Sequence, residues 1–552
     1  MHHTGKRKMI LGACLGNCVH VAGILNFLHL ARSFGYKTHF LGPAVPMTKI
    51  VEAVTSFKPE ILVLSYRLTP EAAKNLLEEF RNEVKKQRWS SITFAFGGPP
   101  PVAEVARKTG IFEAVFDGND PPEKVVSFLR GKIEERKKEA MPPQGLLERI
   151  EFKAPFPLLR HHFGLPSLEE TVKGVREIAL SGLIDVISIG PDQNAQESFF
   201  RPQEMKKEEA GAGGVPLRKP DHLAAIYRSA RVGNYPLFRC YSGTRDLIKW
   251  AEMSLQTINI AWGAVPLCWY NKLDGRSERA PSESIAENQE AMRWYGKKKI
   301  PLEVNEAHHW SLRDAPDTVA VAAAYLAAYN AKKMGVSHYV AQYMFNTPFQ
   351  TSPLMDLAKM LAKIELIESL HDTSFKSVRQ TRTGLTSLSP DFDTAKGQLA
   401  SSTFSQLFLR PKIIHVVAFC EGDHAATPKD IIQSAKIVQG VINNFFLGVP
   451  RITGDARIEE RKNQLIEEAR LLLEAIKEVD TGEMDDPWIN PRTIARAIEV
   501  GLLDAPHLKG CEYASGEVET RMIEGACYAV DPETGKPLKE KERITRVLEK
   551  LK

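Results

Sequence analysis

One histidine of this chain lies where the sequence predicts a ligand-binding loop. His20 follows the apolar run 9–12 and precedes an apolar helical stretch, in a loop bounded by glycines. Ser65 and the pair Gly97-Gly98 follow two later apolar runs in the same way. Because ligands of open α/β sheets bind at the carboxyl ends of parallel strands, we expect these positions to meet at one edge. A histidine there can bind a metal, and glycines let the backbone approach a ligand closely.

The elements around these positions alternate between short apolar strands and amphipathic helices, from residue 8 to about residue 130. That alternation is typical of a parallel sheet covered by helices on both faces. It predicts a flavodoxin-like (Rossmann-like), doubly wound α/β domain over residues 1–132, with strands near residues 9–12, 38–41, 61–65, 92–96 and 114–116. Residues 133–153, a charged stretch that contains a proline pair, are interpreted as a linker.

These loops resemble the vitamin B12 (cobalamin) binding module, whose pattern is Asp-x-His-x-x-Gly, then Ser-x-Leu, then Gly-Gly. The corresponding residues of this chain are Cys18, His20 and Gly23, then Ser65 and Leu68, then Gly97 and Gly98. Cysteine replaces the usual aspartate, and the leucine comes one residue late. The resemblance implies that His20 is the axial ligand of the cobalt and that the residue at position 18 orients it. It also implies that Ser65 binds the displaced tail base and that the glycine pair leaves room for the tail.

A second and longer alternation of strands and helices runs over residues 154–450. Its spacing predicts a (β/α)8 TIM barrel, the catalytic domain of the chain. Seven strands are visible and an eighth is expected within residues 375–410; the seven lie near residues 154–159, 185–189, 236–240, 257–261, 301–304, 338–344 and 413–419. Residues 451–552 are predicted to form a C-terminal extension that packs on the barrel.

Polar side chains at the carboxyl ends of barrel strands face the active site of such a fold. Arg160 and Arg239 suit a carboxylate substrate, because a guanidinium offers a bidentate fork. Each arginine can equally form a structural pair with a neighbouring barrel carboxylate. Glu306 and His308 follow another strand and are candidates to polarise the substrate or exchange a proton with it.

Most of residues 150–535 also resembles the catalytic subunit of glutamate mutase (methylaspartate mutase). The similarity is carried by residues 158–164, 239–246, 501–506 and 514–528. It implies that Arg160 and Arg239 hold a carboxylate and that Tyr270 lines the pocket. Three family segments differ. The second-strand arginine falls near Gln196, the glutamate base falls near residues 261–264, and the Lys-Thr-Pro-His-Glu segment reads Asn-Thr-Pro-Phe-Gln at residues 346–350. We therefore expect a small carboxylate substrate other than glutamate.

Together these resemblances imply an adenosylcobalamin-dependent radical carbon-skeleton mutase, an isomerase with both halves in one chain. Corrinoid methyltransferases usually carry a helical domain ahead of the cobalamin module, and here the module begins at the amino terminus. A corrinoid-dependent methyltransferase and a non-catalytic cobalamin-binding carrier or sensor are the alternatives. A further alternative is a barrel enzyme whose first domain binds no cobalamin. The resemblance also implies a homodimer.

The composition argues against several other classes of protein. The 552 residues carry a net charge of +5 with acids and bases interleaved, so we expect no nucleic-acid partner. Apolar runs long enough to span a bilayer are absent from the sequence, so we expect no membrane association. The seven cysteines contain no Cys-x-x-Cys pair, which argues against disulfides, an iron–sulfur cluster or a thiolate zinc site. That pattern favours the cytoplasm.

Overall fold

The computed structural model describes residues 9–552 except Gly35, Pro121, residues 130–140, Ser242, Pro450, Arg451 and Glu483. The chain forms two compact units, Met1–Ala140 with Asn443–Val449, and Met141–Ile442 with Pro450–Lys552. Residues 133–140 of the predicted linker lie outside the described residues. Its second half contains helix α6 (Leu146–Lys153), which belongs to the second unit. No helix of the described ranges is both long and apolar enough to cross a membrane.

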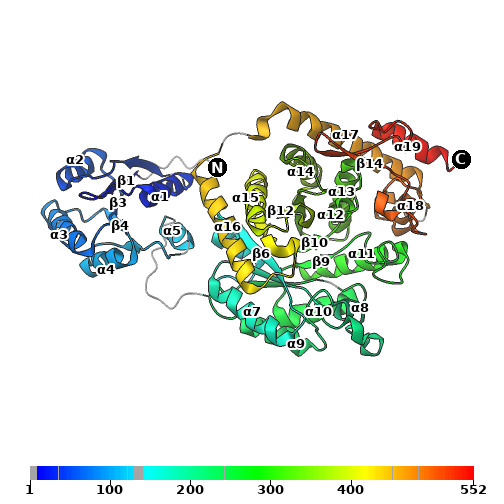
Figure 1. Ribbon diagram of the computed structural model, residues 1–552, viewed down its shortest axis with the longest axis horizontal. Helices are drawn as coiled ribbons and strands as arrows, with labels where there is room; N and C mark the ends of the chain where they lie inside the picture. Colours follow the sequence, from blue (N-terminus) through cyan, green and yellow to red (C-terminus); the bar gives the residue numbers. More distant parts are fainter. Residues whose placement is uncertain are drawn as a thin grey trace. The chain divides into compact units, whose positions relative to one another are not determined.

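The first unit is built on a parallel sheet with strand order β2-β1-β3-β4-β5 (Figure 1). This order confirms the predicted flavodoxin-like fold. The strands are β1 (Met9–Cys14), β2 (Lys37–Phe40), β3 (Ile61–Ser65), β4 (Thr93–Gly97) and β5 (Ala114–Phe116). The helices are α1 (Ala22–Ser33), α2 (Met47–Phe57), α3 (Pro70–Lys86), α4 (Pro100–Thr109) and α5 (Pro122–Leu129). Every residue of β3 is buried, as expected for a strand covered on both faces.

The second unit contains eight parallel strands in the order β8-β7-β6-β13-β12-β11-β10-β9, which form a nearly closed α/β barrel. This confirms the predicted barrel. The strands are β6 (Leu158–Phe163), β7 (Val186–Ile189), β8 (Leu237–Cys240), β9 (Gly263–Val265), β10 (Leu302–Val304), β11 (His338–Phe345), β12 (Lys376–Thr383) and β13 (Ile413–His415). The eighth strand expected within residues 375–410 is β12.

Helices surround this barrel, as Figure 1 shows. They are α7 (Leu168–Ser181), α8 (Gln193–Ser198), α9 (Pro220–Ser229), α10 (Leu247–Ile258), α11 (Pro281–Lys298), α12 (Ala307–Ser311), α13 (Asp317–Lys333), α14 (Pro353–Glu368), α15 (Phe392–Leu407) and α16 (Pro428–Leu447). Short 3-10 helices are η1 (Pro202–Glu204), η2 (Lys207–Glu209), η3 (Leu385–Ser387), η4 (Phe419–Gly422), η5 (Ile452–Gly454), η6 (Pro487–Ile489) and η7 (Pro506–Leu508).

Two predicted barrel strands were misplaced. The strand expected at residues 257–261 is wrong, because α10 continues to Ile258 and ends where Asn259 takes a left-handed conformation with φ 46°. The strand there, β9, begins only at Gly263. The strand expected at residues 154–159 begins later, at Leu158, because α6 occupies the chain up to Lys153.

Helix α6 closes the amino-terminal end of the barrel. Its Leu146 shares a buried apolar cluster with Leu158 and Val186, the first residues of two strands. The buried Arg149 donates hydrogen bonds to the backbone carbonyl oxygens of Pro143 at 2.8 Å and Tyr235 at 2.9 Å. With that end filled, the carboxyl ends of the strands are the face that can hold a ligand.

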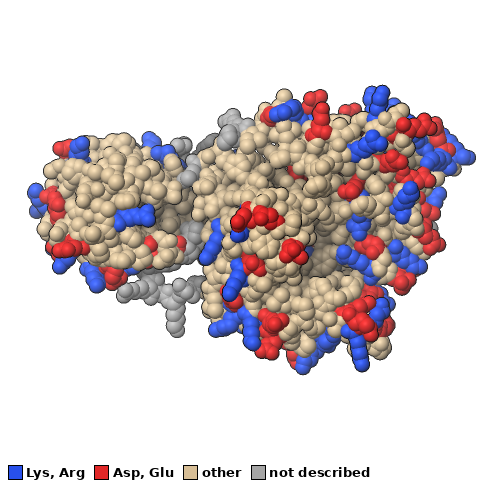
Figure 2. Space-filling model, viewed as in Figure 1, with Lys and Arg blue, Asp and Glu red and all other residues tan. Residues whose placement is uncertain are grey.

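The C-terminal extension packs on the barrel and shares its largest apolar core. Its elements are α17 (Ala456–Glu478), α18 (Pro491–Glu499), β14 (Thr520–Ile523), β15 (Ala526–Ala529) and α19 (Glu540–Glu549). Arg461 of α17 pairs with the buried Asp317 at 3.4 Å, and Lys359 of α14 pairs with the same carboxylate at 3.1 Å. On the face shown in Figure 2, basic and acidic side chains are interspersed.

Candidate functional site

The carboxyl edge of the five-stranded sheet brings together the residues expected to bind cobalamin. Strand register places Cys14 of β1 opposite Ser65 of β3, and Ser65 opposite Gly97 of β4. The loop between β1 and α1 begins at this edge and carries His20. The histidine loop, the serine and the glycine pair therefore meet at one end of the sheet.

His20 is exposed, and its ring is oriented by a cysteine in place of a carboxylate. Its Nδ1 atom lies 3.9 Å from the sulfur of Cys18, whose side chain is fully buried. A thiol is a weaker partner than a carboxylate, so this contact orients the ring less firmly than the usual pair. Among the described residues, none is recorded as a hydrogen-bond partner of the other ring nitrogen, Nε2. An imidazole with one nitrogen toward the protein and one unengaged is a suitable donor for cobalt.

The glycines beside this loop fit the tail of a corrinoid. A Cβ atom added at Gly97 would meet no atom within 4 Å, so the space beside this residue is open. A Cβ atom added at Gly98 would lie 2.6 Å from the carbonyl oxygen of Tyr66, so only glycine allows the strands to pack there. Gly23 also faces open space, at the start of α1. The residues present therefore fit the cofactor that the sequence implies.

Two large apolar side chains are exposed on the same loops. Val19, next to His20, is 62% exposed, and Leu68, after β3, is 38% exposed. Both side chains lie on loops at the carboxyl edge of the sheet, so they would be available to contact the apolar edge of a bound corrin ring.

Inside the barrel, two arginines share one buried carboxylate. Arg160 of β6 lies 3.1 Å from Glu303 of β10, measured from Nη1 to Oε2, and Arg239 of β8 lies 3.4 Å from Oε1. Trp262 donates its indole N–H to Glu303 at 2.8 Å. Burial alone would raise the pKa of Glu303, but Arg239 and Arg160 outweigh it and lower that pKa to about 2. Glu303 is therefore ionised at neutral pH.

The guanidinium of Arg239 has unpaired hydrogen-bond donors among the described residues. Although its side chain is fully buried, its Nε, Nη1 and Nη2 atoms have no hydrogen-bond partner among the described residues. The 3.4 Å approach to Glu303 is close enough for charge attraction but makes no hydrogen bond. Buried unsatisfied donors are costly and mark a place where a ligand is expected. A carboxylate is the ligand that a guanidinium fork matches best.

A chain of hydrogen bonds fixes the proton on His308. Arg160 donates to Gln380 at 2.6 Å, Gln380 donates to Gln342 at 3.2 Å, and Gln342 lies 3.1 Å from Nδ1 of His308. Because arginine can only donate, each amide in turn must accept on one side and donate on the other. Nδ1 of His308 is then an acceptor, and the proton of the neutral ring is on Nε2.

Burial keeps this histidine neutral. It lowers the pKa of His308 to about 3, with a further contribution from the Arg382 charge. His162 and His415, which line the same cavity, also have pKa values well below the usual range, because they are buried near Arg160. The barrel therefore offers neutral imidazoles beside fixed guanidinium charges.

These side chains line a cavity of about 290 Å³ at the barrel mouth. Of the predicted catalytic residues, Arg160, Arg239, Tyr270 and His308 line it. Sequence reasoning missed other polar lining residues: His162, Tyr241, Arg276, Glu303, Asn305, Gln342, Arg382 and His415. Arginines outnumber carboxylates in this lining, so the cavity is suited to an anion.

Glu306 does not line this cavity, which corrects its predicted role. Its Oε2 atom accepts the backbone N–H groups of Leu267 and Cys268, each at 3.0 Å, and Oε1 accepts the indole N–H of Trp310 at 2.8 Å. The carboxylate thus anchors the loop after β9. Burial raises the pKa of Glu306 despite these bonds.

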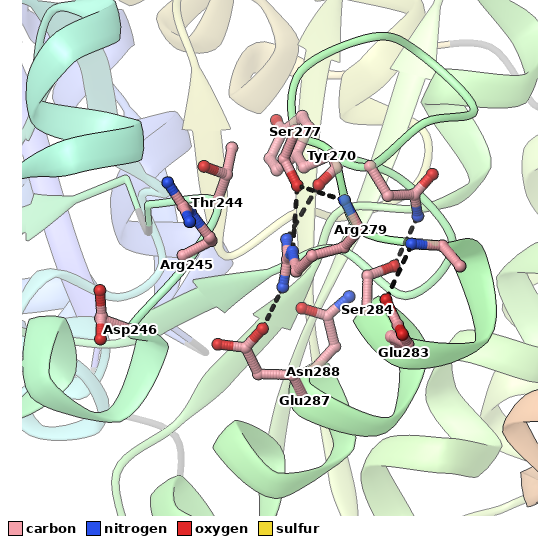
Figure 3. A network of polar contacts seen from close by, with 12 residues as sticks. Thr244, Arg245, Asp246, Tyr270, Ser277, Arg279, Glu283, Ser284, Glu287 and Asn288 are labelled. Atoms are coloured by element: carbon pink, nitrogen blue, oxygen red, sulfur yellow. Dashed lines mark hydrogen bonds and ion pairs between the residues drawn. The ribbon is translucent and has the colours of Figure 1, made fainter. Parts of the chain in front are cut away.

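A polar network holds Tyr270 against the cavity. Figure 3 shows Arg279 reaching Ser277, the carbonyl oxygen of Tyr270 and Glu287 of α11. The bond to the Tyr270 carbonyl measures 2.9 Å, and the bond to Ser277 measures 3.0 Å. The tyrosine itself has a left-handed backbone, with φ 68°. The network keeps the loop in this unfavourable conformation, with its ring beside Arg276 at 4.5 Å.

Residues 8–126 match the family model of the B12 binding domain. The first unit is therefore a cobalamin-binding domain, which confirms the coarser part of the sequence interpretation. The comparisons do not support the more specific assignment to the glutamate mutase family. No curated protein matches the chain significantly.

Several solved structures show limited likeness. A cobalamin-binding protein from Desulfitobacterium hafniense DCB-2 is 27% identical over 20% of this chain, with a TM-score of 0.19, and the match spans 53% of that protein. The radical S-adenosylmethionine methyltransferase TsrM from Kitasatospora setae is 13% identical, covering 74% of this chain and 72% of its own, with a TM-score of 0.19. The cobalamin-dependent S-adenosylmethionine radical enzyme OxsB is 10% identical, covering 89% and 71%, with a TM-score of 0.18. TM-scores this low do not establish a shared fold for the whole chain.

Proposed function

We propose that the chain is an adenosylcobalamin-dependent isomerase that rearranges a small carboxylate in the barrel cavity. The observation that carries this proposal is the buried Arg239, whose three guanidinium nitrogens lack hydrogen-bond partners among the described residues while they line the cavity. The cobalamin-binding domain in the same chain supports a cobalamin-dependent reaction. Adenosylcobalamin, when bound, supplies the radical that removes a hydrogen atom from a substrate.

The residues of the barrel would bind and orient that substrate. Arg239 would donate hydrogen bonds from its guanidinium to the substrate carboxylate, and the charge of Glu303 would hold that guanidinium in place. His308 would donate a hydrogen bond from its Nε2–H group to a substrate oxygen, because its Nδ1 atom already accepts one from Gln342. Because its pKa is far below 7, the His308 ring does not take up a proton at neutral pH. Its role here is therefore to donate a hydrogen bond.

The first unit would hold the cofactor through His20. The exposed ring, the open space beside Gly97 and the exposed Val19 and Leu68 supply a metal donor, a slot and an apolar surface. Ser65, buried beside the slot, is the expected partner of the tail base.

The proposal is tested with the full chain loaded with adenosylcobalamin. The protein is incubated anaerobically with a panel of small mono- and dicarboxylates, and isomeric products are measured by NMR. Isomerisation that needs adenosylcobalamin and falls at least a hundredfold in Arg239→Leu supports the proposal. Arg245→Leu, an arginine outside the cavity lining and bound to Glu204 at 2.7 Å, is the matched control. Methyl transfer with methylcobalamin and no isomer would instead assign a corrinoid methyltransferase, and no turnover with either form would favour a carrier.

A further inference from the structure

One group of side chains outside the cavity has the composition of a metal site. Among the residues that the structure describes, Cys420, His424 and Asp430 offer ligand atoms that all lie within 4.8 Å of one another. Cys420 lies in η4, His424 lies in the loop that follows it, and Asp430 lies in the first turn of α16, with the spacing Cys-x3-His-x5-Asp. None of the three lines the cavity described above.

The histidine of this group is already oriented. Its Nδ1 atom is bonded to Asp423 at 2.8 Å, and its Nε2 atom lies 3.8 Å from Asp430. Metal-binding histidines characteristically hydrogen-bond a carboxylate through the ring nitrogen that does not bind the metal. Here that arrangement leaves Nε2 on the side of Asp430 and Cys420.

The aspartate of this group is also fixed in place. Its Oδ2 atom accepts the hydroxyl of Thr427 at 2.6 Å and the backbone N–H of Thr427 at 3.0 Å. Cys420 is buried, whereas the His424 side chain is 43% exposed, so the cluster is open to solvent on one side. An ion can therefore enter without unfolding of the segment.

We propose that Cys420, His424 and Asp430 bind one divalent transition-metal ion of the zinc class. Thiolate, imidazole and carboxylate are the donors that zinc takes in proteins, and calcium or magnesium would require oxygen donors in greater number. Three protein ligands leave the fourth tetrahedral position for water on the exposed side. The ion would fasten the turn that carries Glu421, which accepts from the backbone of Ala418 at 2.6 Å and pairs with His161 at 3.1 Å.

The proposed site differs from the expectation that this chain has no thiolate zinc site, which was based on the spacing of its cysteines. The absence of a Cys-x-x-Cys pair argues against metal sites with several thiolate ligands. A site with one cysteine needs no such pair, so the cysteine spacing does not reveal it. The histidine and aspartate are recognised as partners only when the turn after β13 is folded.

The test uses the full chain, prepared without cobalamin and dialysed against a chelator. Zn²⁺ is titrated against a chromophoric competitor, and Co²⁺ is added separately to record the thiolate-to-cobalt charge-transfer band. We expect the parent protein to bind one equivalent of Zn²⁺. Cys420→Ser and His424→Ala should each weaken binding at least tenfold and remove the charge-transfer band. Asp423→Asn should weaken it by about tenfold, because the orienting carboxylate is lost.

Three controls keep the result specific. Cys511→Ser changes a cysteine outside the group, and His507→Ala changes another exposed histidine that is paired with an aspartate, so neither should alter binding. The double variant His2→Ala, His3→Ala removes the histidines near the amino terminus. Thermal melting confirms that His424→Ala, at an exposed position, is folded. Equal Zn²⁺ affinity in the parent and His424→Ala would overturn the proposal, as would binding that is lost only in the amino-terminal double variant.

Discussion

Replacing Glu303 with glutamine removes the one carboxylate that, among the described residues, forms ion pairs with both Arg160 and Arg239. Ionisation of Glu303 is favoured in the folded protein, where its pKa falls from 4.5 to about 2. At about 1.4 kcal/mol per pKa unit, this difference corresponds to about 3 kcal/mol of stability at neutral pH. Removal of one partner of a buried ion pair typically costs about 3–5 kcal/mol of stability, which agrees with the value from the pKa difference. We therefore expect Glu303→Gln to lower the free energy of unfolding of the barrel unit by about 3 kcal/mol.

The pH dependence of this loss has a definite sign. Because the folded-state pKa is depressed, the stabilisation is complete above pH 4.5 and is lost as the pH falls toward 2. The difference between parent and variant should thus be constant from pH 7 to pH 5 and should shrink below pH 4.5. Urea denaturation followed by tryptophan fluorescence measures it, since all tryptophans except Trp89 belong to the second unit.

Glu306→Gln is the matched control, because Glu306 is as deeply buried but carries a raised pKa. A raised folded-state pKa means that the parent gains stability relative to this variant as the pH falls toward 4.5. The stability difference between parent and variant should therefore change with pH in opposite directions, below pH 4.5 for Glu303→Gln and above pH 4.5 for Glu306→Gln. A loss below 1 kcal/mol in Glu303→Gln, or the same slope in both variants, would refute the view that the two arginines keep Glu303 ionised.

Three further substitutions test other parts of the account. Gly97→Leu should fold with normal stability and lose cobalamin on gel filtration, because its side chain would fill the open space beside β4; retention of the cofactor would contradict the slot. Gly98→Ala should cost about 1–3 kcal/mol in urea denaturation, since its Cβ would lie 2.6 Å from the Tyr66 carbonyl, and an unchanged midpoint would be the opposing result. Gln342→Leu should release the tautomer of His308, seen as a shift of the imidazole nitrogen resonances from pure Nε2–H toward a mixture. Unmoved resonances would show that the hydrogen-bond chain does not set the tautomer.

Much of the fold could be predicted because its strands are apolar and evenly spaced. The strands of the first unit follow this pattern, and so do most strands of the barrel. Strand β12 reads Lys-Ser-Val-Arg-Gln-Thr-Arg-Thr and has almost no apolar pattern, so only its approximate place was predicted. The β-branched residues near Ile258 suggested a strand, but the packing of α10 prevailed over local propensity.

The candidate site was only partly predictable, because some of its residues lie inside strands and not at the strand ends where site residues are expected. Glu303 is the middle residue of β10, between two apolar residues, and nothing in its neighbours marks it as polar site lining. Alternation within strands was the available signal. Arg160 and His162 are two residues apart on β6 and both line the cavity, as residues on one face of a strand should. The contacts between strands that give Arg239 and His308 their chemistry come from tertiary structure alone.

The most direct test of the account is whether His20 binds the cobalt. The full chain is prepared with nitrogen-15-labelled histidine, loaded with cobalamin and reduced to the paramagnetic cobalt(II) state for electron paramagnetic resonance. The account predicts that the nitrogen splitting of the cobalt lines changes from triplets to doublets on labelling, and that His20→Ala abolishes this change. Triplets that persist in the labelled protein would show that the cofactor's own base, with its unlabelled nitrogen, still occupies the axial position, and the central claim would be wrong.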